Sequence, residues 1–95
     1  MTRRLIIRPE AESDILNAAV WYEGRETGLG FEVIADIRTA IELALEYPQA
    51  QMLLMKDPEV HRILAKRFPY RIFYIVRSDA IVVFSMLHAR RHDQN

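Results

Sequence analysis

The chain contains no cysteine, so disulfides, thiolate nucleophiles and cysteine-ligated zinc sites are all excluded. Long apolar runs are also missing, because no stretch approaches the roughly 20 uninterrupted apolar residues that a membrane-spanning helix requires. The basic start is followed only by the apolar run from Leu5 to Ile7 before Arg8 interrupts it, which is too short for a signal peptide. We therefore expect a cytoplasmic protein with no membrane partner.

A net charge is absent as well, since 13 basic side chains balance 13 acidic ones. The balance hides a division along the chain. Residues 1–59 hold six basic and eleven acidic side chains, whereas residues 60–95 hold seven basic and two acidic ones, together with all three histidines. This division predicts a positive surface formed by the C-terminal part of the chain.

Length and hydrophobic periodicity predict one α+β domain over residues 1–95. Residues 3–8 form a short run, rich in β-branched residues and ended by Pro9, that is typical of a strand. Two helical patterns follow, from Pro9 to about Tyr22 and from about Phe31 to Tyr47, with three glycines between them. The second pattern places Phe31 on its buried face and Asp36 among its polar positions.

Three strand-like runs complete the chain, over residues 60–67, 70–77 and 80–88, and their short links predict an antiparallel meander with the middle run at its centre. Residues 49–59 show no clean period and are predicted to form a connecting loop. The expected fold is a four-stranded sheet covered on one face by a helical hairpin, with the partner of the first strand left open. Apolar side chains on the second face are covered by the long loop or form a docking groove, and the residues alone leave both interpretations open.

One constellation suggests chemistry, namely the strand arginines together with the ending that starts at His88. Metal-independent RNA cleavage needs an acid, a base and fixed cations beside the developing phosphorane charge. His88 could act as acid or base, and Arg62, Arg71 and Arg90 could clamp phosphate. The plainer interpretation, which the residues alone favour, is that His88 closes the last strand and that the arginines pair with acidic helices or a protein partner.

The sequence contains no motif for the other common kinds of catalytic or cofactor site. The acidic residues show no paired-carboxylate or metal-ligand spacing, and no phosphate-cradling glycine loop follows a strand, so no cofactor and no metal are predicted. The aromatic pair Trp21-Tyr22, like Tyr70 and Phe73-Tyr74, falls within amphipathic patterns. We therefore interpret these rings as core or rim residues and not as a base-stacking platform.

The order of strand, helical hairpin and three strands resembles the ParE/RelE toxin family over nearly the whole chain. The most specific pieces of the resemblance are Arg62 at the opening of the second strand, the turn Phe68-Pro69-Tyr70, Tyr74 in the next strand and the His-x-Arg-Arg ending at residues 88–91.

The resemblance implies the toxin of a type II toxin-antitoxin system, held inactive in a hetero-oligomer by a cognate antitoxin whose tail often fills the open face of the sheet. Family members poison DNA gyrase or cut messenger RNA in the ribosome. Lys66 is the only lysine in the predicted strands and no aromatic residue follows Phe84, so we expect the non-enzymatic, gyrase-inhibiting branch related to plasmid stabilisation.

Two alternatives remain at this point. One is a ribosome-dependent mRNA endoribonuclease of the RelE kind, with Arg62, Arg71 and His88 as its catalytic residues. The other is a non-toxic binding module of the same fold. In either toxin, the residues expected to contact the target are Arg62, Lys66, Arg67, Arg71, His88, Arg90 and Arg91.

Overall fold

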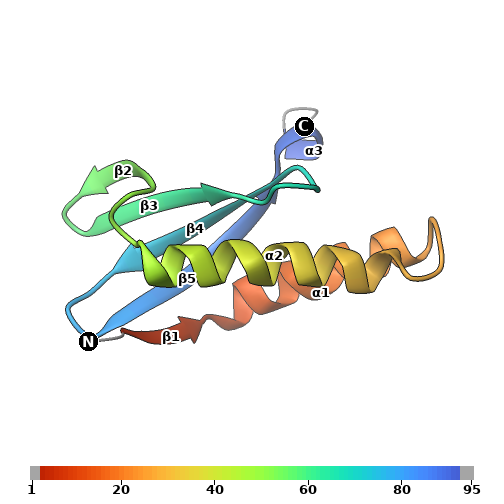
Figure 1. The fold of residues 1–95 in the computed structure, drawn as a ribbon. Coiled ribbons are helices and arrows are strands. Elements are labelled where there is room, and N and C mark those ends of the chain that lie inside the picture. The colour runs from red at the N-terminus through yellow and green to blue at the C-terminus, as the bar shows by residue number, and fades with distance from the viewer. Residues whose placement is uncertain (1–2, 93–95) are drawn as a thin grey trace.

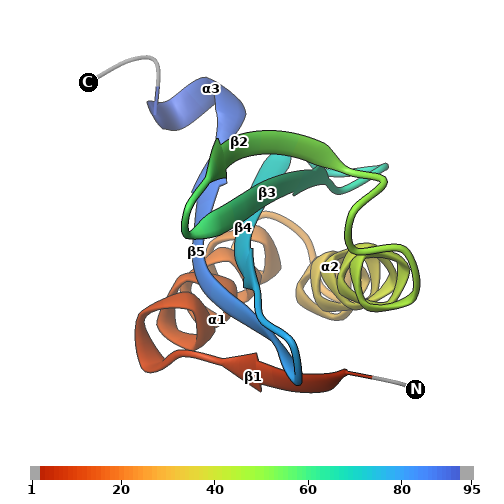
Figure 2. The same ribbon diagram turned by 90° about the vertical axis from the view of Figure 1, so that its left-hand side faces the viewer.

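The computed structural model describes residues 3–92, with only the backbone at residues 91 and 92, as one sheet with a helical hairpin on one side (Figures 1 and 2). Along the chain the elements are β1 (Arg4–Ile7), α1 (Pro9–Glu23), α2 (Leu29–Glu46), β2 (Met52–Lys56), β3 (Glu59–Leu64), β4 (Tyr70–Val76), β5 (Ala80–His88) and α3 (Ala89–His92). The strand order is β1-β5-β4-β3-β2, with β1 parallel to β5 and the other pairs antiparallel.

The α+β architecture, the meander β3-β4-β5 and the central position of β4 are confirmed. The sheet has five strands where four were expected, because residues 52–56 form the edge strand β2 inside the segment predicted to be a loop. All five residues of β2 are exposed, and its register against β3 shifts between Leu53 and Met55. A strand without a buried face shows no alternation of apolar and polar residues, so the sequence pattern missed it.

The sharp corner between α1 and α2 depends on two glycines and one carboxylate. Gly28 has φ of 96°, and a Cβ added at Gly30 would lie 2.9 Å from the Ala19 carbonyl oxygen. The backbone N–H groups of Gly28 and Gly30 donate to the Glu23 carboxylate at 3.0 and 2.9 Å, which satisfies donors at the start of α2. These bonds hold the pKa of Glu23 below its ordinary value.

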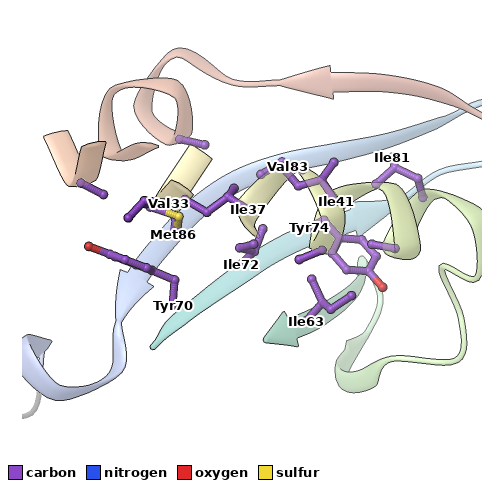
Figure 3. Packing of buried hydrophobic residues seen from close by; sticks show 14 of the residues in the cluster. Val33, Ile37, Ile41, Ile63, Tyr70, Ile72, Tyr74, Ile81, Val83 and Met86 are labelled. Atoms are coloured by element: carbon purple, nitrogen blue, oxygen red, sulfur yellow. The ribbon is translucent and has the colours of Figure 1, made fainter. Parts of the chain in front are cut away.

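The core lies between the helical hairpin and the sheet (Figure 3). Its buried members from the helices include Ala11, Ala18, Val33, Ile37 and Ile41, and those from the strands include Ile63, Tyr70, Ile72, Tyr74, Ile81, Val83 and Met86. The predicted face of the second helix was wrong at two positions. Phe31 is 81% exposed, and Asp36, expected among the polar positions, is buried.

Asp36 is buried because it binds the loop that follows β3. Its carboxylate oxygen accepts the backbone N–H groups of Arg67 and Phe68 at 3.0 and 2.9 Å. The strand predicted for residues 60–67 accordingly ends at Leu64, and the loop residues Lys66 and Arg67 lie outside it. A carboxylate on α2 thus accepts hydrogen bonds from two backbone N–H groups that strand pairing leaves without a partner.

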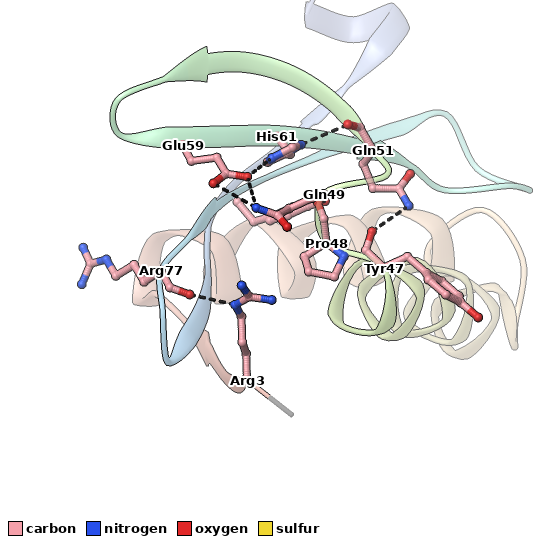
Figure 4. Close-up of polar contacts among 9 residues, drawn as sticks. Arg3, Tyr47, Pro48, Gln49, Gln51, Glu59, His61 and Arg77 are labelled. Atoms are coloured by element: carbon pink, nitrogen blue, oxygen red, sulfur yellow. Dashed lines mark hydrogen bonds and ion pairs between the residues drawn. The ribbon is translucent and has the colours of Figure 1, made fainter. Parts of the chain in front are cut away.

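A second polar network connects the end of α2 to the sheet (Figure 4). The buried His61 ring donates from Nδ1 to the carbonyl oxygen of Gln51 at 3.0 Å and pairs through Nε2 with the Glu59 carboxylate at 2.7 Å. The hydrogen bond from His61 is the main cause that lowers the pKa of Glu59. Tyr74 stacks on His61, and its hydroxyl donates to the Pro48 carbonyl oxygen at 2.7 Å.

We expect the substitution Asp36→Ala to lower the free energy of unfolding by about 1–3 kcal/mol, because it leaves buried backbone donors without a partner. Urea denaturation followed by circular dichroism measures the loss. Glu42→Ala, at an exposed position of the same helix, is the matched control and should stay within about 0.5 kcal/mol of the wild type. Equal effects of the two substitutions would contradict the role assigned to Asp36.

The hydrogen bonds that the Glu23 carboxylate accepts at the α1-α2 corner predict that the free energy of unfolding depends on pH. The pKa of Glu23 is lower in the folded chain than its ordinary value of 4.5. The contribution of Glu23 to stability is therefore complete above pH 4.5 and is lost as the pH falls through the folded pKa. At pH 7 the wild type should therefore be more stable than Glu23→Gln. This difference should narrow as the pH falls below about 4.5 in urea titrations. A difference that is the same at pH 3 and pH 7 would exclude the proposed contribution of the carboxylate charge.

Candidate functional site

The residues predicted to contact a target fall into two groups in the structure. Arg62 on β3 and Arg71 on β4 lie on the open face of the sheet, which we define as the face opposite α1 and α2. Four others line a hollow at the end of the sheet: Lys66, Arg67, His88 and Arg90. The side chain of Arg91 lies outside the described residues.

The open face follows from the alternation of side chains along β4. Ile72 and Tyr74 belong to the core, so Arg71, Phe73 and Ile75 point to the opposite face. Register then places other side chains beside them on this face: Val60, Arg62 and Leu64 from β3, and Val82, Ser85 and Leu87 from β5. The outcome is an apolar surface that carries two arginines.

Arg62 is incompletely satisfied on this surface. Its Nε atom is buried and has no hydrogen-bond partner among the residues that the structure describes. The expected pairing of arginines with acidic helices is seen for Arg67, whose guanidinium lies 2.6 Å from the Glu32 carboxylate. Within residues 3–92, neither Arg62 nor Arg71 takes part in a salt bridge. A buried donor without an acceptor is costly, so the open face favours a partner that supplies one.

The hollow at the end of the sheet, which we call the end hollow, has a volume of about 610 Å³. Three aromatic side chains line it and are called its aromatic floor below: the Tyr22 ring packs edge-on against Trp21 and Phe68 with centroid distances of 4.8 and 4.9 Å. Lys66 and Arg90 are exposed at its margin. The backbone N–H of Ala89 donates to the Pro69 carbonyl oxygen at 2.7 Å and holds two sides of the hollow together.

His88, the last residue of β5, is held at both ring nitrogens. Its Nδ1 accepts the backbone N–H of Arg90 at 3.1 Å, so the proton of the neutral ring is on Nε2. That nitrogen lies 3.4 Å from the Tyr22 hydroxyl. In this arrangement the neutral ring offers no unoccupied lone pair to a substrate, which a general base would need.

Sequence reasoning missed the aromatic part of the end hollow. Trp21 and Tyr22 were expected in the core or at its rim and Phe68 in the turn before the next strand, and Tyr22 and Phe68 do pack against the core. The same rings line the hollow, and Arg25, which is not itself a lining residue, lies 4.1 Å above the Trp21 ring. The available signal was the adjacency of aromatic and basic residues in Arg67-Phe68, but only the tertiary fold brings α1 to this loop.

None of the helices in residues 3–92 is long and apolar enough to cross a membrane. The same residues contain no group of three or more histidine, aspartate or glutamate side chains placed to hold a metal ion.

Comparisons with known proteins agree with this architecture. No curated protein matches the chain. A solved structure described as "Chromosomal ParDE TA system from P. aeruginosa" has the same fold, with a TM-score of 0.78 at 15% sequence identity, and the match covers 92% of this chain and 96% of that one. The family model for the ParE toxin of the type II toxin-antitoxin system parDE matches residues 5–93. The chain therefore belongs to the ParE toxin family.

Proposed function

We propose that this chain is the toxin of a cytoplasmic type II toxin-antitoxin pair, neutralised by an antitoxin on the open face of the sheet, and that its target is DNA gyrase. The observation that carries the proposal is the open face of a ParE-family fold, which is apolar and contains a buried guanidinium nitrogen without an acceptor. The structural relative is described as a toxin-antitoxin system, which is consistent with a protein partner of this kind.

The chemistry of the open face defines what the antitoxin must present. Apolar side chains have to cover Phe73 and Ile75, and carboxylate or carbonyl oxygens have to reach Arg62 and Arg71. The edge strand β2 offers a further surface, since Met52 and Met55 are 55% and 52% exposed. An amphipathic antitoxin segment with acidic residues meets these requirements.

Gyrase is preferred over the ribosome because the end hollow lacks the features of a nuclease site. His88 has both ring nitrogens engaged by Arg90 and Tyr22, and Lys66 is the only lysine near it. The basic group formed by Lys66 and Arg90 remains at the surface, where it can contact a protein-DNA complex. Binding without bond cleavage is therefore the simpler role for this end of the sheet.

We expect induced expression of the chain alone to arrest growth, and co-expression of the antitoxin encoded beside it to restore growth. Arg71→Glu should weaken antitoxin binding at least tenfold in calorimetry, because it places a negative charge where an acidic partner group is expected. Arg38→Glu, the same charge change at an exposed position of α2, is the control and should leave binding unchanged. Normal growth with abundant folded protein would favour the non-toxic binding module.

We expect the purified protein to inhibit gyrase supercoiling or to trap cleaved DNA, and to make no cuts in messenger RNA on translating ribosomes. His88→Gln should remain toxic, because glutamine keeps a donor for the Tyr22 hydroxyl, whereas a nuclease would lose roughly 10²- to 10⁴-fold in its chemical step. Replacing Arg90 and Arg91 together with Glu should abolish toxicity. Codon-phased cuts that disappear in His88→Gln would establish the ribonuclease instead.

A further inference from the structure

We propose that the end hollow binds one unpaired nucleotide of a single-stranded nucleic acid, with the base against the aromatic floor and the phosphate at Lys66 and Arg90. The juxtaposition that points to this ligand is an aromatic floor from α1 and the β3-β4 loop with cations at its margin. The inference goes beyond the proposed function, because it names a ligand for the toxin itself and does not require gyrase.

The floor is built from aromatic side chains, the residue type on which unpaired bases stack. Two of its rings are each accompanied by an arginine: Arg25 lies 4.1 Å above the Trp21 ring, and Arg67 lies 5.3 Å above the Phe68 ring. A guanidinium and a base compete for the same ring face, and a guanidinium can also stack on a base. Of these two arginines only Arg67 lines the hollow, so it is the arginine whose position a base can take or cover.

The margin of the end hollow is positive. Lys66 and Arg90 are exposed there, and neither takes part in a salt bridge within the part of the chain that the structure describes. Arg67 is different, because the Glu32 carboxylate lies 2.6 Å from its guanidinium on the solvent side. Two cations are thus available to a phosphate, while Glu32 restrains a third.

One hydroxyl can add a directed hydrogen bond. Because the Nε2–H of neutral His88 faces the Tyr22 oxygen, the hydroxyl hydrogen of Tyr22 is left to donate to an acceptor in the hollow. The carbonyl groups of a base and the oxygens of a phosphate are such acceptors.

Size and access favour a single strand over a duplex. A volume of about 610 Å³ is within the roughly 300–1,000 Å³ of ordinary small-molecule sites, so it accommodates a mononucleotide unit. A base in a duplex is stacked and paired, and its faces cannot reach an aromatic floor without being flipped out. A single strand has unpaired bases, so one of its nucleotides can both fit the volume of the hollow and place a base against the aromatic rings.

Trp21 makes the binding directly measurable, because it is the only tryptophan in the chain and lines the hollow. The intrinsic fluorescence of the purified protein is titrated with an octamer of deoxythymidylate, with the same octamer annealed to its complement, with deoxyribose 5-phosphate and with inorganic phosphate. We expect the single-stranded octamer to change the Trp21 emission saturably and to bind at least tenfold more tightly than the other three.

Two variants test the two halves of the site. Phe68→Leu keeps an apolar side chain but removes the ring, and should weaken binding of the octamer roughly 5- to 150-fold, the usual contribution of one stacked base. Lys66→Gln should weaken binding and reduce the salt dependence, by roughly 0.7 in the slope of log K against log salt. Lys56→Gln on β2 changes the only other lysine and is the matched control, with no expected effect.

Three outcomes overturn the proposal. Equal affinity for inorganic phosphate indicates an anion site only, and equal affinity for the duplex indicates nonspecific attraction to the backbone. Binding unchanged in Lys66→Gln excludes the hollow even where Phe68→Leu is too unstable to assay. The titrations contain no gyrase, so a protein that binds the octamer but leaves supercoiling intact contradicts the gyrase proposal alone.

Discussion

Two helices packed side by side cover one face of this five-stranded sheet, and within residues 3–92 no second layer covers the other face. Side chains on the two faces of β4 alternate, so covering Ile72 and Tyr74 leaves Phe73 and Ile75 on the opposite side. The resulting apolar surface is the structural basis for a protein partner. The long connection between α2 and β3 does not cover it, because it extends the sheet at the edge as β2.

The division of charge along the sequence has a structural cause. Acidic residues of the N-terminal part accept bonds from within the fold: Asp14 from the Met86 N–H, Glu23 from the α1-α2 corner, Asp36 from the β3-β4 loop and Glu59 from His61. These carboxylates thus hold neighbouring segments of the fold in place through hydrogen bonds. Much of the positive charge of the C-terminal part remains at the surface, where it is available to partners.

The sequence predicted the two helices because their hydrophobic period reflects one buried face, and it predicted the three-strand meander from strand-like runs joined by short links. Prediction from the sequence failed where the structure leaves no periodic pattern of apolar residues. The edge strand β2 has no buried face, the buried Asp36 is polar, and the parallel pairing of β1 with β5 joins segments far apart in the chain. The candidate site was predictable only in part, since residue types suggested phosphate contacts but the separation of Arg62 and Arg71 from the end hollow depends on strand alternation.

The end of β5 connects the two candidate surfaces. Leu87 is paired with Arg71 and faces the open side, whereas the next residue, His88, is paired with Tyr70 and lines the end hollow. Under the proposed function, an antitoxin laid along the open face as far as Leu87 ends beside the hollow. A short extension of that antitoxin past the end of the sheet then blocks Lys66 and Arg90 by occupying their space, and no rearrangement of the toxin is needed for neutralisation.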